Sequence, residues 1–284
     1  MGAAHLERAR KHINDEFYTP LEAVKNECDF YLDAFKGKVI YSNCDSFASA
    51  FKSYFLQLWA AGVIKRYICS GIDPQTREPF FLDTADPWGW AETGNCFIAE
   101  NRRRIREADI IITNPPFSKL GHYMAMILAA KKDFITVIPL TFIRRPLLLP
   151  RLKAGTIRMG YTKFDIDGAR CYWITSLPVR KAPAPLAPAL PAKLHYYDGT
   201  DIINIDRTDS IPAGWPYLLG VPIYALQKLA PDQYDIIDIV KPHINGRALY
   251  DRVIIKLRGS INEDYQRYKR TDRARPGGLL SLFS

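Results

Sequence analysis

Short apolar runs alternate up to about residue 180 with segments whose apolar side chains recur at helical spacing. Runs typical of buried strands occupy residues 38–41, 65–70, 109–113 and 134–140, and residues 156–176 predict two more strands joined by a turn. Helical spacing predicts helices at residues 49–61, 100–108 and 121–132, while residues 71–90 predict a loop or a divergent hairpin. Strands and helices in alternation predict an α/β fold in which helices cover a parallel sheet.

The character of the chain changes after residue 180. Residues 181–193 are rich in Pro and Ala, which continue neither a helix nor a sheet, so we expect an extended connector. A ligand for a proline-binding module is the alternative interpretation of this segment. Residues 194–260 predict a second, smaller α/β portion, and residues 261–284 predict a flexible basic tail.

Composition is that of an ordinary globular chain with an excess of basic residues. The 284 residues are 48% hydrophobic and 24% charged, which is enough apolar material for a sizeable core. The longest apolar stretch, residues 134–143, is about half of what a membrane-spanning helix needs, and no secretion signal opens the chain. We therefore expect a cytoplasmic protein. The net charge of +9 is consistent with a polyanionic partner such as nucleic acid.

Cysteine and histidine positions predict neither a metal site nor a disulfide framework. The five cysteines are widely separated and form no Cys-x-x-Cys pair. The five histidines show no metal-ligand spacing either. Any chemistry of this chain is therefore expected to come from other side chains.

The tetrapeptide Asn114-Pro115-Pro116-Phe117 directly follows the strand predicted at residues 109–113. Open α/β sheets bind ligands at the carboxyl ends of their central strands. Each proline removes a backbone donor and leaves a carbonyl acceptor, Asn114 adds an amide oxygen, and Phe117 adds a flat apolar face. Such acceptors beside an aromatic ring suit a planar base that carries an exocyclic amine.

The same residues predict how such an amine can react. The Asn114 amide oxygen and the Pro115 carbonyl can bind its two hydrogens, which localises the nitrogen lone pair for attack on a methyl group. The sulfonium methyl of S-adenosylmethionine is the natural electrophile. A base stacked on Phe117 has to be flipped out of a duplex first. The alternative is that the tetrapeptide only ends a strand and begins a helix, with Ser118 as N-cap.

Asn-Pro-Pro-Phe after a buried strand resembles the catalytic motif of amino-methyltransferases. Phe17-Tyr18-Thr19-Pro20 looks like the Phe-x-Thr-Pro segment that precedes the sheet in adenine-specific DNA methyltransferases, and the order of these parts resembles the gamma class. Further stretches are similar to the EcoRI-type adenine methyltransferases: residues 35–45, 107–109, 173–177, 220–223, 231–234 and 244–247.

The resemblance implies a Rossmann-like S-adenosylmethionine-dependent methyltransferase sheet with helices on both faces, acting on the N6 amine of adenine in double-stranded DNA. It implies that residues 1–180 form the catalytic domain, that residues 194–260 recognise the target, and that a restriction endonuclease is a functional partner without stable contact. The implied catalytic residues are Asn114, Pro115, Pro116 and Phe117. The implied cofactor-binding residues are Phe17, Tyr18, Thr19, Pro20, Asn43, Cys44, Asp45, Ser46 and Asn95.

Two positions depart from the family pattern. Cofactor loops are typically glycine-rich, yet residues 43–49 contain small residues and no glycine, as in the EcoRI-type group. Asn95 stands where family members have an acid, and its amide oxygen can still accept from the adenine amino group of the cofactor.

Basic residues divide into two groups by their expected place on the sheet. Arg102, Arg103, Arg104 and Arg106 lie on a helix that enters a strand, so we expect a solvated helix face at the edge opposite the active site rather than a DNA patch. The predicted DNA contacts are Lys119, Arg144, Arg145 and Arg247, the first three because each follows the carboxyl end of a strand.

Two other functions stay open at this point. Methyltransferases for ribosomal RNA or protein glutamine also use Asn-Pro-Pro-aromatic, although the early Phe17-Tyr18-Thr19-Pro20 segment and the long C-terminal portion count against them. A catalytically silent DNA-binding module with the same fold is the second alternative, because the cofactor loop lacks glycine.

Overall fold

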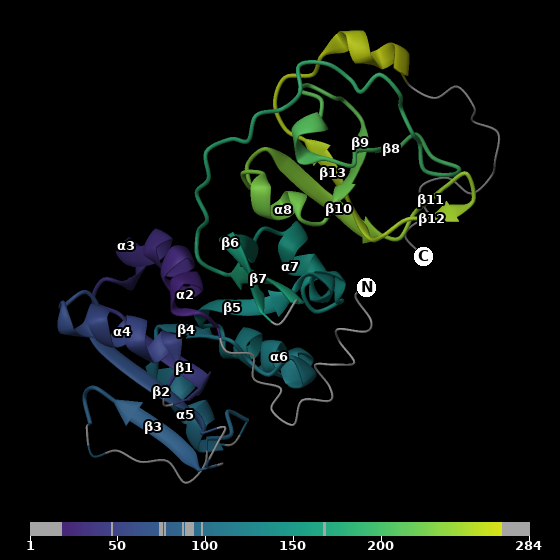
Figure 1. Cartoon of the computed structure of the whole chain (residues 1–284). Coiled ribbons are helices and arrows are strands. Elements are labelled where there is room, and N and C mark those ends of the chain that lie inside the picture. The colour runs from purple at the N-terminus through teal and green to yellow at the C-terminus, as the bar shows by residue number, and fades with distance from the viewer. Residues whose placement is uncertain are drawn as a thin grey trace. The chain divides into compact units, whose positions relative to one another are not determined.

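The computed structural model describes residues 19–46, 48–73, 76, 78–86, 88, 94–97, 99–166 and 169–268. The chain forms two compact units, and Figure 1 traces them in colour from the N-terminus to the C-terminus. The first unit contains the described residues up to Ile143 together with Ile157–Pro178, and the second contains Arg144–Thr156 and the described residues from Val179 onward. Within these described ranges, no helix has the length and apolar character needed to cross a membrane.

A seven-stranded sheet in the order β3-β2-β1-β4-β5-β7-β6 forms the centre of the first unit (Figure 1). Its four middle strands β2, β1, β4 and β5 are parallel, whereas β3 and β7 run antiparallel to their neighbours. The strands are β1 Val39–Asp45, β2 Arg66–Ile72, β3 Pro79–Asp83, β4 Ile110–Thr113, β5 Asp133–Pro139, β6 Arg158–Ile166 and β7 Ala169–Thr175. The helices are α2 Leu21–Cys28, α3 Leu32–Phe35, α4 Ala50–Ala60, α5 Ala99–Glu107 and α6 Leu120–Ala130.

These elements confirm the predicted alternation of strands and helices. All residues of β4 are buried, as expected for a central strand covered on both faces. Ser49 caps α4, because its side chain accepts hydrogen bonds from the backbone N–H groups of Phe51 and Lys52. For residues 71–90, the hairpin alternative is correct for the part described, since β3 pairs antiparallel with β2.

Helices flank the sheet on both faces. Phe55 of α4 stacks on Tyr67 of β2, with ring centroids 5.5 Å apart. On β1, Tyr41 donates to Asn101 of α5, and Asn43 accepts from Tyr123 of α6. Tyr67 pairs in register with Ile40, and successive side chains of a strand point to opposite faces, so α4 covers one face while α5 and α6 cover the other. This mixed α/β sheet is consistent with a methyltransferase fold.

A buried carboxylate attaches α2 to the edge strand β6. Glu27 accepts hydrogen bonds from the backbone N–H groups of Tyr161 and Thr162 at 2.7–3.0 Å, and from the hydroxyls of Thr162 and Tyr31. A Cβ at Gly160 would lie 2.1 Å from Glu27 Oε1, so only glycine admits this approach. Burial raises the pKa of Glu27, and the hydrogen bonds oppose that effect. The contact fixes the helix that begins immediately after Thr19 and Pro20.

The second unit contains a four-stranded sheet in the order β10-β13-β9-β8 and a separate two-stranded sheet, β11-β12. Its strands are β8 Ile203–Asn204, β9 Leu218–Pro222, β10 Tyr234–Val240, β11 His243–Ile244, β12 Arg247–Ala248 and β13 Arg252–Leu257, and its helices are α7 Leu149–Lys153 and α8 Ala225–Lys228. The Pro/Ala-rich segment forms neither a helix nor a regular strand. It is held by Ala187, which bridges to Pro212, and by Gln233, whose amide bonds both backbone groups of Ala184.

Candidate active site

The candidate site lies at the carboxyl edge of the seven-stranded sheet, which we define as the edge where β1, β2, β4 and β5 end. The strand order reverses between β1 and β4, and open α/β sheets place their ligands at such a switch point. At this point the hydroxyl of Thr113 bridges the two strands, since it accepts from Cys44 N at 3.3 Å and lies 3.4 Å from Cys44 O. The edge therefore brings together Asp45, the last residue of β1, and Asn114, which follows β4.

A cavity of about 250 Å³ opens at this edge. It is lined by three stretches far apart in the sequence: the residues before α2, the end of β1 with the start of α4, and the residue after β4. Its lining residues are Thr19, Leu21, Cys44, Asp45, Ser46, Ala48, Ser49, Ala50, Phe51, Ser53 and Asn114. The structure thus brings four predicted cofactor residues to the predicted catalytic asparagine.

The Asn114 side chain is held in a defined orientation. Asn114 is 9% exposed, and its Nδ2 donates to Thr19 Oγ1 at 3.1 Å across 95 positions of sequence. Thr19 is buried as well. Because Thr19 holds the donor atom Nδ2, the position of the acceptor atom Oδ1 at the other end of the amide is fixed as well.

Asp45 places a buried carboxyl group in the cavity wall. Burial raises its pKa to about 7, against hydrogen bonds from the Ser49 side chain, the Ser46 backbone N–H and the Tyr67 hydroxyl, and against the nearby charge of Lys52. The Ser46 N–H lies 3.0 Å from Asp45 Oδ1, and the Tyr67 hydroxyl lies 3.3 Å from Oδ2. This carboxyl group changes charge near neutral pH, which is unusual for an aspartate.

Glycines outside the predicted cofactor loop, residues 43–49, allow the backbone to pack closely at this edge. A Cβ at Gly71 would lie 1.6 Å from the carbonyl oxygen of Asp45, its register partner in β1. A Cβ at Gly94 would lie 1.6 Å from the carbonyl oxygen of Gly71. The ends of β1 and β2 and the segment at Gly94 therefore stack without room for side chains. The glycines of this site stand at 71 and 94, outside residues 43–49.

Asn43 and Cys44 take different positions at the end of β1. Asn43 is buried, and its Oδ1 accepts from the Tyr123 hydroxyl at 2.7 Å, on the face covered by α6. Cys44 lines the cavity, and its Sγ lies 3.4 Å from Cys96 Sγ. Asn43 is therefore a support of the strand end, and Cys44 belongs to the cavity wall.

Asn95 is exposed and already engaged with its own neighbourhood. Its Oδ1 accepts from the Phe97 backbone N–H at 3.0 Å, and its carbonyl accepts from Asn101 Nδ2 at 2.8 Å. The Phe97 ring lies 4.5 Å from the His122 ring of α6. The acceptor expected to meet the cofactor's adenine thus also holds the local turn, and its contact with a cofactor stays a prediction.

The residues after Asn114 form a 3-10 turn before α6. Pro115 is buried, while Pro116 and Phe117 are partly exposed. The 3-10 helix Phe117–Lys119 leads directly into α6, whose N-cap position is Lys119 without a side-chain cap. The alternative in which Ser118 caps this helix is therefore wrong in that detail, because the 3-10 turn moves the N-cap position by one residue, to Lys119.

Phe17 and Tyr18 lie outside the described residues, so their predicted cofactor role stays a prediction. Pro20 is exposed at the N-cap position of α2. Of the Phe17-Tyr18-Thr19-Pro20 segment, the structure therefore places Thr19 in the cavity wall.

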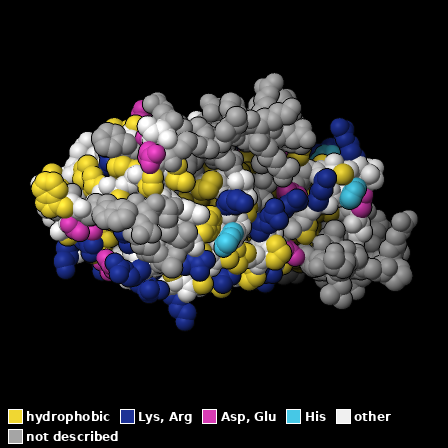
Figure 2. Space-filling model, turned by 90° about the horizontal axis from the view of Figure 1, so that it is seen from below, with side chains coloured by type: hydrophobic (Ala, Val, Ile, Leu, Met, Phe, Trp, Pro, Cys, Tyr) yellow, Lys and Arg dark blue, Asp and Glu magenta, His cyan; other side chains and the backbone are white. Residues whose placement is uncertain are grey.

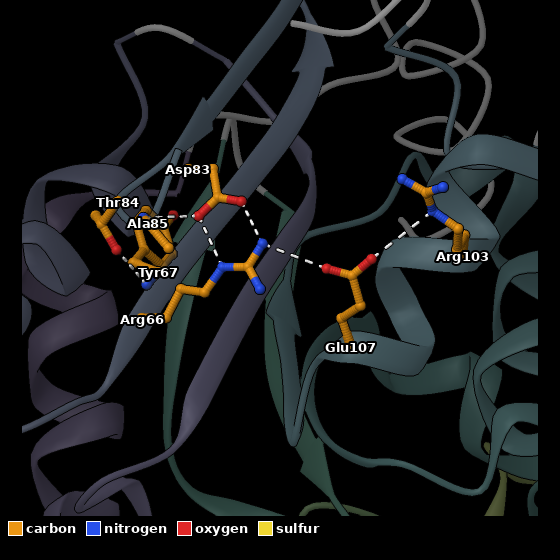
Figure 3. A network of polar contacts seen from close by, with 7 residues as sticks. All are labelled: Arg66, Tyr67, Asp83, Thr84, Ala85, Arg103 and Glu107. Carbon is orange, nitrogen blue, oxygen red and sulfur yellow. Dashed lines mark hydrogen bonds and ion pairs between the residues drawn. The ribbon is translucent and has the colours of Figure 1, made fainter. Parts of the chain in front are cut away.

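Arg103 of α5 belongs to a network at the opposite edge of the sheet, which we call the amino edge (Figure 3). Arg66, the first residue of β2, makes a two-pronged ion pair with Asp83 and lies 3.3 Å from Glu107. Arg103 pairs with Glu107 at 3.8 Å. The guanidinium of Arg104 lies 4.0 Å from the centre of the Phe81 ring. The expected solvated position at the edge opposite the active site is confirmed for Arg103, which is exposed. It is wrong for Arg104, which is buried against Phe81, the register partner of Ser70 near the carboxyl end of β2.

The predicted DNA contacts are placed as follows. Lys119, Arg144, Arg145 and Arg247 are all exposed, and Arg144 also pairs with Asp251 at 3.1 Å. Their contacts with DNA stay predictions. Across the described ranges, no group of three or more His, Cys, Asp and Glu side chains is arranged to hold a metal ion.

Sequence reasoning missed several side chains that build this site. Ser49 and Phe51 line the cavity, Thr113 bridges β1 and β4, and Tyr123 supports Asn43. Ser49 carries a readable signal, because serine before an apolar helix is a common N-cap. Thr113 and Tyr123 carry none, because their partners are 69 and 80 residues away in the sequence.

Comparison with known proteins finds methyltransferases both among family models and among individual relatives. The family described as adenine-specific methyltransferase EcoRI matches the chain over residues 5–86, 90–169 and 159–275. Type II methyltransferase M.EcoRI of Escherichia coli is 27% identical over 312 residues, covering 88% of this chain and 95% of the relative. Type II methyltransferase M.MpnI of Mycoplasma pneumoniae is 24% identical over 320 residues, covering 90% and 99%. No solved structure matches the chain significantly.

The family match decides between the functions that the sequence left open. The family is described as an adenine-specific methyltransferase, which excludes a protein glutamine as the acceptor and a catalytically silent module. The relatives are named Type II methyltransferases, which supports DNA rather than ribosomal RNA as the substrate. The match includes the residues on both sides of the cavity, from Thr19 to Asn114. The chain therefore belongs to the EcoRI-type family of adenine-specific methyltransferases.

Proposed function

We propose that the chain transfers a methyl group from S-adenosylmethionine to the N6 amine of an adenine in double-stranded DNA, with Asn114 and Pro115 as the groups that bind the amine. The observation that carries this proposal is the buried hydrogen bond between Asn114 and Thr19 in the wall of a cavity. It ties the residue after β4 to the segment before α2, and so joins the proposed amine site to the proposed cofactor site.

The residues of the cavity fit the proposed cofactor. S-adenosylmethionine, when bound, supplies an electrophilic methyl group on a sulfonium centre and carries a separate ammonium group. The cavity wall offers a buried carboxyl at Asp45 and the hydroxyls of Ser46, Ser49 and Thr19, which suit cationic and polar groups. We assign cofactor binding to these residues together with Cys44 and, in the preceding segment, Phe17 and Tyr18.

Asn114 and Pro115 would activate the amine by accepting its two hydrogens. The adenine amine is a weak nucleophile because its lone pair is delocalised into the ring. Hydrogen bonds to Asn114 Oδ1 and to the Pro115 carbonyl draw the nitrogen toward a tetrahedral shape and localise the lone pair. Thr19 contributes by holding the amide so that Oδ1, rather than Nδ2, meets the amine. The proton leaves after the transfer, so no base with a matched pKa is required.

The target adenine is out of reach inside a duplex and has to be flipped out of the helix. Phe117, partly exposed in the turn after Pro116, offers a face on which the base can stack, worth about 1–3 kcal/mol. Lys and Arg side chains outnumber Asp and Glu on the face shown in Figure 2, and the chain carries a net charge of +9. Both features favour a polyanionic substrate. Residues 194–260 are proposed to recognise the sequence, and a restriction endonuclease is the proposed functional counterpart.

The test is methyl transfer from tritiated S-adenosylmethionine to unmethylated genomic DNA, followed by mass spectrometry of the nucleosides. We expect the label in N6-methyladenine, and single-molecule sequencing of the same DNA then gives the recognition site. Parallel reactions offer ribosomal RNA and total protein. Label confined to RNA would replace DNA as the substrate, and DNA binding without transfer would contradict the enzymatic assignment.

A further inference from the structure

A two-stranded hairpin stands apart from the four-stranded sheet of the second unit. It consists of β11 and β12, joined by the turn Asn245-Gly246 (Figure 1). Both turn residues have positive φ, 51° at Asn245 and 75° at Gly246. Asn-Gly with positive φ at both positions is the sequence preferred by a tight type I′ turn, whose twist matches that of the flanking strands. The hairpin is therefore locally encoded.

The hairpin is fixed at its turn by a carboxylate from a distant loop. Asp198 accepts from the backbone N–H groups of Asn245 at 2.7 Å and Gly246 at 2.8 Å. The Asp198 N–H in turn donates to the carbonyl of His243 at 2.9 Å. A two-residue ladder alone gives marginal stability, so these three bonds keep the turn in one conformation.

Apolar residues fix the base of the same hairpin. Ile244 and Leu249 pack against a buried cluster that contains Tyr197, Val240 and Ile254. The Leu249 N–H also donates to the Pro242 carbonyl at 2.8 Å, which extends the ladder toward the sheet. The hairpin is thus held both at its turn and at its base.

The side chains that this hairpin presents are not needed to hold it. Arg247 is exposed, and within the described ranges it forms no ion pair. Other arginines of the unit do: Arg252 pairs with Asp206, Arg258 pairs with Asp235, and Arg144 pairs with Asp251. Near the hairpin, the charge of Asp251 is therefore engaged by Arg144, and Asp198 binds backbone N–H groups.

Aromatic and further basic side chains accompany Arg247. Tyr250, directly after the hairpin, is 85% exposed. His243 and Lys241 are exposed as well. Arg, Lys and Tyr side chains are among those that contact DNA, and a rigid element loses little conformational entropy when it binds. The composition and rigidity fit an interaction element.

We propose that the β11–β12 hairpin enters the major groove of the substrate duplex and that Arg247 reads one base pair there. The proposal rests on the proposed function, because it assumes duplex DNA as the substrate. The major groove admits a two-stranded β-ribbon, and the groove's guanine edge offers two acceptors that match the fork of a guanidinium. The hairpin supplies both the ribbon and the unpaired guanidinium.

The experiment compares methylation of short duplexes by wild-type protein, Arg247→Ala, Arg247→Lys and the control Arg207→Ala. Arg207 is also an exposed arginine of the second unit, but it lies outside the hairpin sequence and its guanidinium is paired with Asp209. The duplexes carry the recognition site found by sequencing of methylated genomic DNA, or that site with each base pair changed in turn. The measured quantity is kcat/KM for each duplex at two salt concentrations.

We expect Arg247→Ala to lower kcat/KM on the intact site about 5- to 150-fold and to lose discrimination at one base pair only. Arg247→Lys should lose the same discrimination while keeping the salt dependence, because lysine keeps the charge without the fork. Arg207→Ala should behave as wild type. A uniform loss on all duplexes with a weaker salt dependence would mean a phosphate contact and overturn base reading. Unchanged kinetics would overturn the hairpin as a DNA contact, and a wild-type protein that methylates no DNA would overturn the proposed function with it.

Discussion

The two edges of the seven-stranded sheet use polar residues in different ways. At the amino edge, Arg66 is bracketed by Asp83 and Glu107, so each charge meets an opposite charge within the fold (Figure 3). At the carboxyl edge, Asp45 is a buried carboxyl with a pKa near 7, and Asn114 is a buried amide in a cavity wall. Ion pairs between side chains of the fold are typical of structural positions, whereas buried titratable groups around a cavity are typical of functional sites.

The difference extends to the supporting residues. Asn43, at the end of β1, accepts from Tyr123, yet its Nδ2 is buried and has no hydrogen-bond partner within the described ranges. Native proteins leave few buried donors unsatisfied, and those few often mark sites with a further task. We therefore expect variants at the carboxyl edge to impair catalysis or cofactor binding without loss of stability, and variants at the amino edge to lose stability without loss of catalysis.

Replacement of Asn114 by alanine should have the largest effect. The substitution removes one of two groups proposed to bind the amine, which by analogy with loss of one oxyanion-hole donor costs roughly 3 kcal/mol, or about 10²- to 10³-fold in kcat. Single-turnover methyl transfer to DNA measures the loss, and calorimetry of S-adenosylmethionine binding checks that the cofactor site persists. Turnover at the wild-type rate would sink the catalytic assignment.

Asp45 should make cofactor binding depend on pH. A cationic cofactor favours the carboxylate, and burial raises the pKa of this group to about 7 with Tyr67 and Lys52 as its ionisable neighbours. Affinity for S-adenosylmethionine should therefore fall about tenfold for each pH unit below 7. Titration calorimetry between pH 5.5 and 8 measures the slope, and Asp45→Asn should abolish it. A slope that survives in Asp45→Asn belongs to another group.

The same group predicts a stability change of known sign. A carboxyl whose pKa rises on folding holds its proton longer in the folded protein than in the unfolded chain. The folded protein loses stability because the buried carboxyl group is harder to ionise than the exposed one. This loss is absent below the usual pKa of 3.8, grows as pH rises, and is complete above about pH 7. Asp45→Asn removes this cost, so its melting temperature should exceed that of wild type at pH 8 and approach it near pH 4. A melting temperature at pH 8 no higher than that of wild type would contradict this.

Thr19→Val tests orientation rather than chemistry. Valine keeps the shape of threonine but offers no acceptor to Asn114 Nδ2, so the amide loses its fixed orientation. We expect the activation barrier to rise by about 1 kcal/mol, which lowers kcat about fivefold. Thr19→Ser retains the hydroxyl and should restore kcat. The split between kcat and the dissociation constant of S-adenosylmethionine is the measurement. Weaker cofactor binding with unchanged kcat would mean that Thr19 serves the cofactor alone.

Local patterns were sufficient to predict much of the fold and the centre of the site. The apolar run of β4 and the helical spacing of α4 are encoded within a few residues, and the strand at 109–113 and the helix at 49–61 were predicted close to their observed bounds. The position of Asn114 followed from the strand that precedes it. The gathering of Thr19 and Asn114 was expected from a family resemblance, since 95 residues separate them.

Features that depend on distant partners could not be predicted. Glu27 reads as one more acid on an amphipathic helix, and only its bonds to Tyr161 and Thr162 reveal it as the attachment of α2 to β6. From the sequence alone, Gly71 and Gly94 are typical loop glycines. The structure shows that Gly71 packs against the backbone of Asp45 and Gly94 against the backbone of Gly71. The roles of these residues depend on burial and on contacts between segments far apart in the sequence, which local spacing does not reveal.

Asp83→Asn should have the smallest effect on catalysis and so sharpens the contrast between the edges. Burial pushes the pKa of Asp83 upward, but hydrogen bonds from Arg66 and the Ala85 N–H outweigh it and hold the pKa below its usual range. Its stabilising effect is therefore present above the unfolded pKa of 3.8 and is lost as pH falls through the folded value. We expect the variant to lose about 1 kcal/mol of unfolding free energy at pH 7, by urea denaturation, with kcat unchanged. The deficit should shrink toward pH 3, where the wild-type carboxylate also takes up its proton. A fall in kcat as large as that of Thr19→Val would show that the amino edge communicates with the site, and the division of labour between the edges would then be wrong.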